Sequence, residues 1–300
     1  MAKENIIAFS QAHAEPEWLQ VRRQTAFDKI SELKLPLIQR VKLDRWNFGS
    51  NDITESLDSS NVPDFTNLGE NPKLIQVGTT TVFQQLSPDL ANKGVIFTDF
   101  YSALEEIPEI IEQYFGTALP FDEDKLTAYH TAYFNSAAVL YVPDNVEVNV
   151  PVEGLFYQDS DEAVPFNKHV LIIVGKHAKL SYLERFESLG KDSVKNTANI
   201  AVEVIALEGA QVKFSAIDRL GSNLTTFISR RGRLNKNAQI DWNLGVMNEG
   251  NVVADFDSDL VGEGSHAELK AVAISSGKQI QGIDTRVTNY APHSIGHILQ

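Results

Sequence analysis

The chain changes its hydrophobic period near residue 139. Before that position apolar residues recur every three or four positions in short stretches, and after it apolar and polar residues alternate. The first helical stretch covers residues 16–34, where five side chains fall near one face: Trp18, Val21, Thr25, Ile30 and Leu33. Pro16 suits the first turn of a helix and Pro36 ends one, so we predict an amphipathic helix between them.

Two more helices are predicted before the period changes. Residues 102–115 have apolar side chains at helical spacing, with Gly116 as a C-terminal stop, and Pro108 should bend or divide this helix. A third helix is predicted over residues 123–134. Residues 40–70 are polar and should be irregular. The turn-like sequences of that polar stretch are residues 49–52 and 58–61.

Strand character begins with a run of valines. Val146, Val148, Val150 and Val152 are spaced two apart, which predicts a strand. A five-residue pattern, alanine followed by apolar side chains at the third and fifth positions, then occurs four times. Its copies begin at Ala178, Ala210, Ala238 and Ala267, separated by 32, 28 and 29 positions. The aromatic residues at the fifth position of the first three copies should stack inside the fold. They are Tyr182, Phe214 and Trp242.

Each copy of the pattern follows a turn that contains Gly or Asn. Alternating stretches precede the last three of these turns, over residues 200–207, 226–234 and 252–260. The unit is thus strand, turn, strand, and such units bury an apolar face only when they stack. We therefore predict a mainly β fold with a parallel β-helix, a solenoid, over residues 136–300, after a mixed and mostly helical region over residues 1–135. An antiparallel sandwich is the alternative, but it has less reason to repeat a pentapeptide at this interval.

Composition excludes several classes of function. A formal net charge of −14 repels phosphate backbones, so we expect no nucleic-acid partner. The N-terminus lacks the features of a secretory signal, and the apolar runs are far shorter than the roughly 20 residues that span a bilayer as a helix, so we expect a cytoplasmic protein without a membrane partner. The absence of cysteine excludes disulfides, thiolate zinc sites and cysteine-ligated clusters within these residues.

Two groups of side chains invite a chemical interpretation. Asp255, Asp257 and Asp259 alternate on a predicted strand, so their carboxylates share a face and could bind calcium or act on a polysaccharide. The plainer expectation is a solvated outer face, paired with Arg230, Arg231 or Arg233 on a neighbouring strand.

His293 and His297 would share a strand face but lie about 13 Å apart, too far for one metal ion unless the chain turns at Gly296. His169, His177 and His266 occur singly, and we expect local hydrogen bonds for each. Neither a nucleophile elbow nor a phosphate-binding loop occurs in the sequence. We therefore assign no residue a catalytic, cofactor-binding or metal-binding role.

Four stretches of the sequence resemble the SufB/SufD family. They are residues 16–36, 109–116, 137–152 with its Tyr-Val-Pro and Val-x-Val-x-Val-Pro elements, and 291–296. The resemblance implies a right-handed β-helix and a non-enzymatic scaffold subunit of the SufBCD iron–sulfur cluster assembly complex. Its partners would be a SufB-like β-helix subunit and, through a C-terminal helical region, the ABC-type ATPase SufC. The absence of cysteine resembles SufD more than SufB. No cofactor is expected in this chain, and a cluster would be assembled at the level of the complex.

Members of this family continue beyond the point that corresponds to Gln300. We therefore expect a C-terminally truncated chain, with an incomplete β-helix and without the ATPase-docking region. An uncovered end of a β-helix tends to recruit another strand edge, so we expect self-association through residues 278–300. Two alternatives to the scaffold remain open: a β-helix polysaccharide lyase or hydrolase that uses the aspartate row, and a purely structural β-solenoid.

Overall fold

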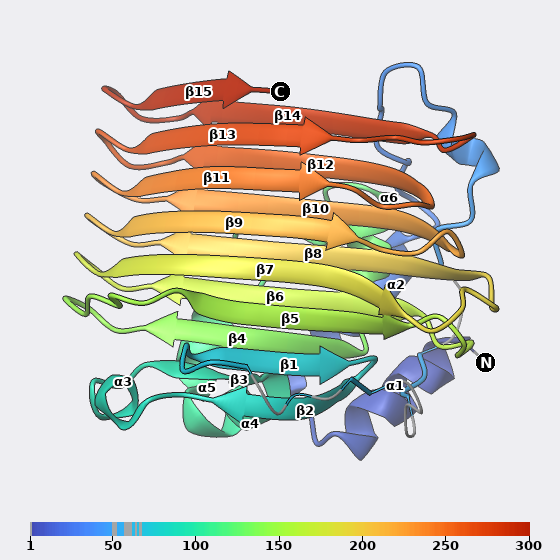
Figure 1. Cartoon of the computed structure of the whole chain (residues 1–300), viewed down its shortest axis with the longest axis horizontal. Coiled ribbons are helices and arrows are strands. Elements are labelled where there is room, and N and C mark those ends of the chain that lie inside the picture. Colours follow the sequence, from blue (N-terminus) through green and yellow to red (C-terminus); the bar gives the residue numbers. More distant parts are fainter. Residues whose placement is uncertain (1, 50–52, 57–61, 64, 66–67) are drawn as a thin grey trace.

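The alternating stretches form two sheets that stack into a right-handed parallel β-helix (Figure 1). The computed structural model describes the chain except for residues 1, 50–52, 57–61, 64 and 66–67. The sheet that we call sheet A contains β1 (Lys73–Val77), β2 (Thr80–Gln85), β5 (Val152–Asp159), β7 (Lys179–Leu189), β9 (Gln211–Arg219), β11 (Gln239–Val246), β13 (His266–Ala273) and β15 (Ile295–Leu299). Sheet B contains β3 (Ile96–Asp99), β4 (Ser136–Val142), β6 (Phe166–Val174), β8 (Asn196–Ala206), β10 (Leu224–Leu234), β12 (Asn251–Leu260) and β14 (Gln281–Asn289). The prediction of a mainly β fold with a solenoid core is confirmed.

The first three copies of the five-residue pattern stack in register. Tyr182 pairs with Phe214, which pairs with Trp242 on the next strand. Their ring centroids are 5.3 and 4.6 Å apart, and each side chain is at most 1% exposed, so the predicted aromatic stack is confirmed. Burial of these large rings between the sheets contributes strongly to stability.

The fourth copy of the pattern is displaced by two residues. Ala267 pairs with Ile240 rather than with Ala238, and Leu269 pairs with Trp242. A shift of two keeps every side chain on its own face of the strand, so Ala267 and Leu269 remain buried. The prediction that Ala238 and Ala267 occupy the same position in stacked strands is therefore wrong, although the prediction of which face is buried is right.

The tight turns between sheet B and sheet A also stack on one another. Each turn has one residue with positive φ: Asn145, His177, Gly209, Asn237, Gly264 and His293. The backbone N–H of each of the first five donates to a carbonyl of the next turn, over distances of 2.7 to 3.1 Å. The turns thus extend the hydrogen-bond ladder of the strands around the corner, which fixes the register of the whole stack.

The N-terminal region covers the outer face of sheet B. It contains α1 (Ala2–Ala12), α2 (Glu17–Lys29), a short 3₁₀ helix (Leu43–Arg45), α3 (Pro88–Asn92), α4 (Phe100–Glu106), α5 (Pro108–Tyr114) and α6 (Lys125–Tyr133). Phe100, Phe115 and Phe134 from this region pack against Leu171 and Ile173 of β6. Strands β6 and β8 of sheet B are consequently buried on both faces, whereas β9 and β11 of sheet A alternate between buried and accessible side chains. None of the described helices is long and apolar enough to cross a bilayer.

The first predicted helix exists, but its predicted buried face is wrong. Val21 is 55% exposed, whereas Arg23 is completely buried. Arg23 pairs with Glu15 at 2.7 Å, donates to the Phe134 carbonyl at 2.8 Å and stacks on the Phe134 ring. These partners compensate the guanidinium for the loss of water, so an arginine takes the place expected of an apolar residue.

The predicted strand over Val146–Val152 is also wrong in most of its length. Val146 and Val148 make two ladder hydrogen bonds with Lys179, but Val150 is 42% exposed and β5 begins only at Val152. Pro151 has no N–H to donate, which interrupts the ladder at that point. Strands β1, β2 and β3 were not predicted, and they lie within residues 1–135.

The other helical predictions are confirmed. Pro108 divides the second helix into α4 and α5, and Gly116 follows with a φ of 73°. The third predicted helix is α6. In the described part of residues 40–70 the only regular element is the 3₁₀ helix, and the predicted turn at 58–61 lies outside the described residues, as does most of the one at 49–52.

Candidate functional site

An arginine lies inside the β-helix, between the two sheets. Arg230 projects inward from β10, and its Nη2 atom lies 2.8 Å from Glu184 Oε1 on β7 and 2.7 Å from Asp218 Oδ1 on β9. All three side chains are completely buried. One guanidinium therefore serves two carboxylates, which leaves one acid in excess. Burial raises the pKa of Glu184 to about 7 against the opposing effect of Arg230. We identify Glu184 as the surplus acid of this cluster, which we call the interior cluster.

The predicted aspartate row does face outward from β12, but the expectation of a solvated face is wrong. Asp255 and Asp257 are 6% and 3% exposed because the segment that carries Glu123, just before α6, lies over them. Asp259 is half-buried. The expected pairing with Arg231 is confirmed: its Nη2 atom lies 2.5 Å from Asp255 Oδ2 and 2.7 Å from Glu123 Oε1.

Arg231, Arg286, Glu123, Asp255 and Asp257 form an outer cluster. Like the interior cluster, it has one carboxylate more than it has guanidinium groups. Asp257 accepts from both Arg231 and Arg286, so two guanidinium groups face three carboxylates. Burial raises the pKa of Asp255 to about 7, although Arg231 lowers it. The three carboxylates lie close enough for one cation, but the arginines already neutralise two of them. A glycan could not reach the carboxylates of Asp255 and Asp257, because both are buried and already paired with arginines.

Two histidines meet where α6 covers sheet B. His130 Nε2 on α6 lies 3.0 Å from His169 Nδ1 on β6, and His169 Nε2 lies 3.1 Å from Glu203 Oε1 on β8. Glu203 also accepts from the backbone N–H groups of Gly116, Ala118 and Leu119. Burial lowers the pKa of His130 well below its usual value, which keeps this imidazole neutral. These groups join the helical region to the β-helix, and His169 is not the locally bonded single residue that we expected.

The structure pairs His297 with a different histidine from the one considered in the sequence. His293 occupies the stacked turn before β15, whereas His297 lies on β15 beside Glu268 of β13. His297 Nδ1 is 3.6 Å and His266 Nε2 is 3.8 Å from the same oxygen, Glu268 Oε1. The three side chains form what we call the histidine–glutamate cluster, on the outer face of sheet A.

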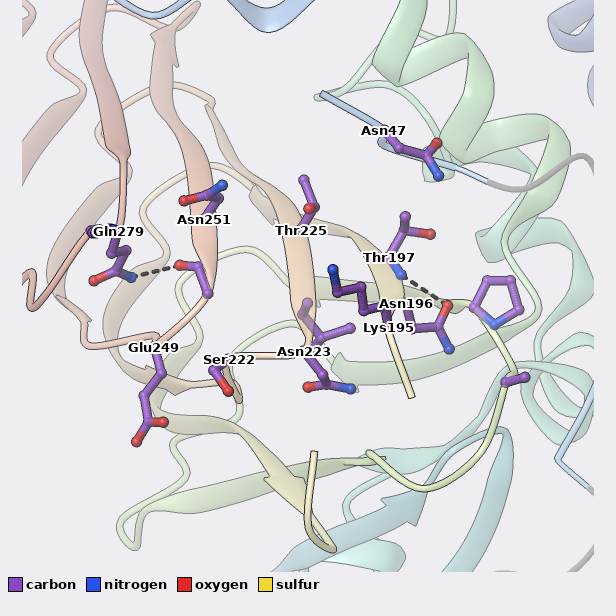
Figure 2. A pocket seen from close by; sticks show the side chains of 15 residues that line it. Asn47, Lys195, Asn196, Thr197, Ser222, Asn223, Thr225, Glu249, Asn251 and Gln279 are labelled. Carbon is purple, nitrogen blue, oxygen red and sulfur yellow. Dashed lines mark hydrogen bonds between the residues drawn. The ribbon is translucent and has the colours of Figure 1, made fainter. Parts of the chain in front are cut away.

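A polar crevice of about 610 Å³ follows the opposite ends of the strands, where the longer turns from sheet A to sheet B stack. Figure 2 shows amide and hydroxyl side chains from successive turns around it, with Asn47 of the N-terminal region on one side. Three of these amides bond to the backbone of a neighbouring turn: Asn196 to the Val164 carbonyl, Asn223 to the Val194 carbonyl and Gln279 to the Gly250 carbonyl. The amides hold the turns together, so we assign this crevice a structural role.

Exposed apolar side chains gather on the last turns of the β-helix. We call this group the apolar end: Val272, Ile274, Ile280, Tyr290, Ile295, Ile298 and Leu299, each between 45% and 67% exposed. These side chains lie near β14 and β15, the edge strands at one end of the two sheets, whereas β2 and β3 are the edge strands at the other end. Ile298 pairs with Leu269, which pairs with Trp242, so it continues the buried aromatic column. In the 300-residue chain these apolar groups beside unpaired strand edges favour association with further strands.

Sequence reasoning missed the interior cluster, although the signal was present. Arg230 alternates in phase with the buried Ile228 and Leu234, so strand periodicity already places it inside. The same reasoning applies to Glu184, which lies between the buried Tyr182 and Phe186. The histidine–glutamate cluster has no comparable signal, because it depends on the register of two strands that are 29 residues apart.

Family models match most of the chain. Residues 69–153 match the SufBD protein N-terminal region, and residues 156–300 match the SufBD core domain of the SUF system for iron–sulfur cluster assembly. The boundary between the two matches falls at the beginning of β5.

Curated relatives agree with these matches. The chain is 33% identical to the iron–sulfur cluster assembly protein SufD of Bacillus subtilis, with 99% of this chain and 71% of the relative aligned. It is 23% identical to a SufBD family protein of Staphylococcus saprophyticus, over 99% of this chain and 67% of the relative, and 24% identical to one of Staphylococcus epidermidis, over 95% and 60%. The similarity thus extends over nearly the whole of this chain and over 60–71% of these relatives.

Proposed function

The chain belongs to the SufBD family, and on that premise we propose that it is a non-enzymatic scaffold subunit of a cytoplasmic SufBCD-type complex that assembles iron–sulfur clusters. The proposal is carried by the similarity to SufD over 99% of the chain. The iron–sulfur cluster is the product of the assembly, and this chain supplies no cysteine ligand to it. The partners would be a SufB-like β-helix subunit and a SufC-like ATPase.

Two structural observations support a docking role. The charged side chains that first suggested catalysis, Asp255 and Asp257, are buried and paired with arginines, so they serve stability rather than a reaction. The outer face of sheet A, in contrast, keeps accessible side chains on β9 and β11. A partner subunit could dock on such a face and cover its exposed apolar side chains.

Co-expression with the SufB-like and SufC-like proteins of the same source tests the proposal. With an affinity tag on the SufB-like protein, we expect this chain to be recovered in a fixed ratio. Substitution of Ile217 and Val272, two exposed apolar side chains of the outer face of sheet A, together by lysine should reduce the recovery, whereas Val21→Lys, an exposed apolar position on α2, should not. If the two partners recover each other but never this chain, the proposed function is wrong.

A further inference from the structure

The outer face of sheet A carries a cluster of potential metal ligands that the N-terminal region does not cover. His266 and Glu268 are two residues apart on β13, so both project from the same face. The parallel register places His297 of β15 directly beside Glu268. His266, Glu268 and His297 are 28%, 34% and 67% exposed at their side chains, so an ion from solvent can reach all three.

The distances within the cluster are close to those of a metal site. Glu268 Oε1 lies 3.6 Å from His297 Nδ1 and 3.8 Å from His266 Nε2, and all three ligand atoms lie within 4.8 Å of one another. Bonds of 2.0 to 2.2 Å to a central ion place neighbouring ligand atoms about 3.3 to 3.6 Å apart in a tetrahedral site. Side-chain rotations that move these atoms by about an ångström would therefore close the cluster around one ion.

The two oxygens of Glu268 have separate partners. Lys270 Nζ lies 3.0 Å from Oε2, whereas Oε1 faces the two imidazoles. The lysine therefore orients the carboxylate and leaves one oxygen free for an ion, as supporting side chains do around ligands in metal sites. By contrast, the carboxylates around Arg231 already have guanidinium partners.

We propose that His266, Glu268 and His297 bind one divalent transition-metal ion, with the remaining coordination positions open to water or to a partner's ligand. Two imidazoles and one carboxylate suit Fe²⁺, Co²⁺ and Zn²⁺, and the lack of cysteine makes this a site for an ion rather than for a thiolate-bound cluster. That Fe²⁺ is the ion used in the cell rests on the proposed function. The site itself does not depend on that function, because its geometry belongs to this chain alone.

Titration of the untagged chain with Co²⁺ tests the site directly, because the visible absorption of Co²⁺ reports its coordination. We expect one ion per chain, displacement by Zn²⁺, and binding of Fe²⁺ under anaerobic conditions in competition with a chromophoric chelator. Loss of a supporting residue already costs metal affinity about 10- to 100-fold. His266→Ala, His297→Ala and Glu268→Gln should therefore each weaken binding by at least that factor.

Two histidines outside the cluster provide matched controls. His177 and His293 are exposed and lie in the stacked turns with positive φ, a conformation that asparagine tolerates. His177→Asn and His293→Asn should leave Co²⁺ affinity within twofold of the parent chain. Equal affinity in the parent and in the His266→Ala/His297→Ala double variant would overturn the proposal, as would no saturable binding in the parent. Unchanged melting temperatures would show that the variants are folded. If the parent chain binds metal but is not recovered with its partners, the metal site stands and the proposed function is wrong.

Discussion

Arg230 holds two buried carboxylates together inside the β-helix, so its removal leaves charges without a partner. Arg230→Met should destabilise the chain by about 3–5 kcal/mol, the usual cost of breaking a buried ion pair by removing one partner. The loss is measured as the change in the free energy of unfolding by urea. Arg233→Met on the same strand is the control, because Arg233 is partly exposed, and it should cost much less. Equal losses in the two variants would show that the interior cluster does not need its arginine.

The surplus acids of the two clusters should make stability depend on pH. The pKa values of Glu184 and Asp255 are both raised to about 7 by burial, whereas in the unfolded chain they have ordinary values near 4. Between about pH 4 and about pH 7 these two acids are protonated in the folded chain but ionised in the unfolded chain. Their contribution to the free energy of unfolding is therefore largest below about pH 4, and it is lost as the pH rises to about 7. Each group contributes a slope of up to about 1.4 kcal/mol per pH unit.

Urea unfolding at several pH values between 5 and 8 measures this slope. Glu184→Gln and Asp255→Asn should each flatten it, because an amide does not titrate, whereas Glu147→Gln at an exposed position should leave it unchanged. If all three variants kept the slope of the parent chain, Glu184 and Asp255 would not be the groups that hold the extra protons in the folded chain.

Single residues also show where sequence reasoning reaches its limit. Strand periodicity is sufficient to predict that Arg230 faces inward, but it cannot identify Glu184 and Asp218, which lie 46 and 12 residues away, as its partners. The helical pattern around Trp18 and Val21 failed for a related reason. The partners that stabilise Arg23 in the core, Glu15 and the Phe134 carbonyl, become apparent only once the helix has packed on the rest of the chain.

At the scale of elements, an alanine in the turns between the sheets should lower stability more where its methyl group overlaps a neighbouring turn than where the backbone has a positive φ. A Cβ at Gly262 would lie 1.9 Å from the backbone nitrogen of Lys236 in the turn below. Gly277 has a φ of 60° but open space around it. Gly262→Ala should therefore cost about 3 kcal/mol as overpacking, and Gly277→Ala about 1–2 kcal/mol as left-handed strain. Thermal and urea unfolding compare the two variants, and a larger loss for Gly277→Ala would show that the stacked turns can separate freely.

The repeat made most of the β-helix predictable, because both the alternation of apolar residues and the recurring five-residue pattern can be recognised within short stretches of sequence. The strands β8, β10 and β12 lie close to where the alternating stretches placed them. The two-residue displacement of the fourth copy was not predictable. A shift by two residues leaves the alternation of buried and exposed positions unchanged, so the sequence pattern is the same for both registers. The histidine–glutamate cluster depends on that kind of register, which explains why its three residues were treated separately in the sequence.

At the scale of the whole molecule, the two sheets differ in what covers them. The helical region buries the outer face of sheet B, and sheet A keeps its alternating accessible side chains, including those of the histidine–glutamate cluster. The sequence predicted the helices and the sheets but not which sheet the helices cover. That choice depends on contacts such as Phe115 with His169 and His130 with His169, which join segments far apart in the chain.

The apolar end should also make the 300-residue chain associate with itself. Ile298 continues the column of Trp242 and Leu269, which are 1% exposed, yet it is 45% exposed. Full burial of such a side chain stabilises by about 1.5–3 kcal/mol, so two molecules gain by covering their ends with each other. Static light scattering should give an average mass above 33.3 kDa that rises with concentration. Ile298→Lys should return the mass toward one chain, because the ammonium group resists burial, and Val21→Lys should not. A mass of one chain for the parent at every concentration would show that the apolar end is not sufficient for association.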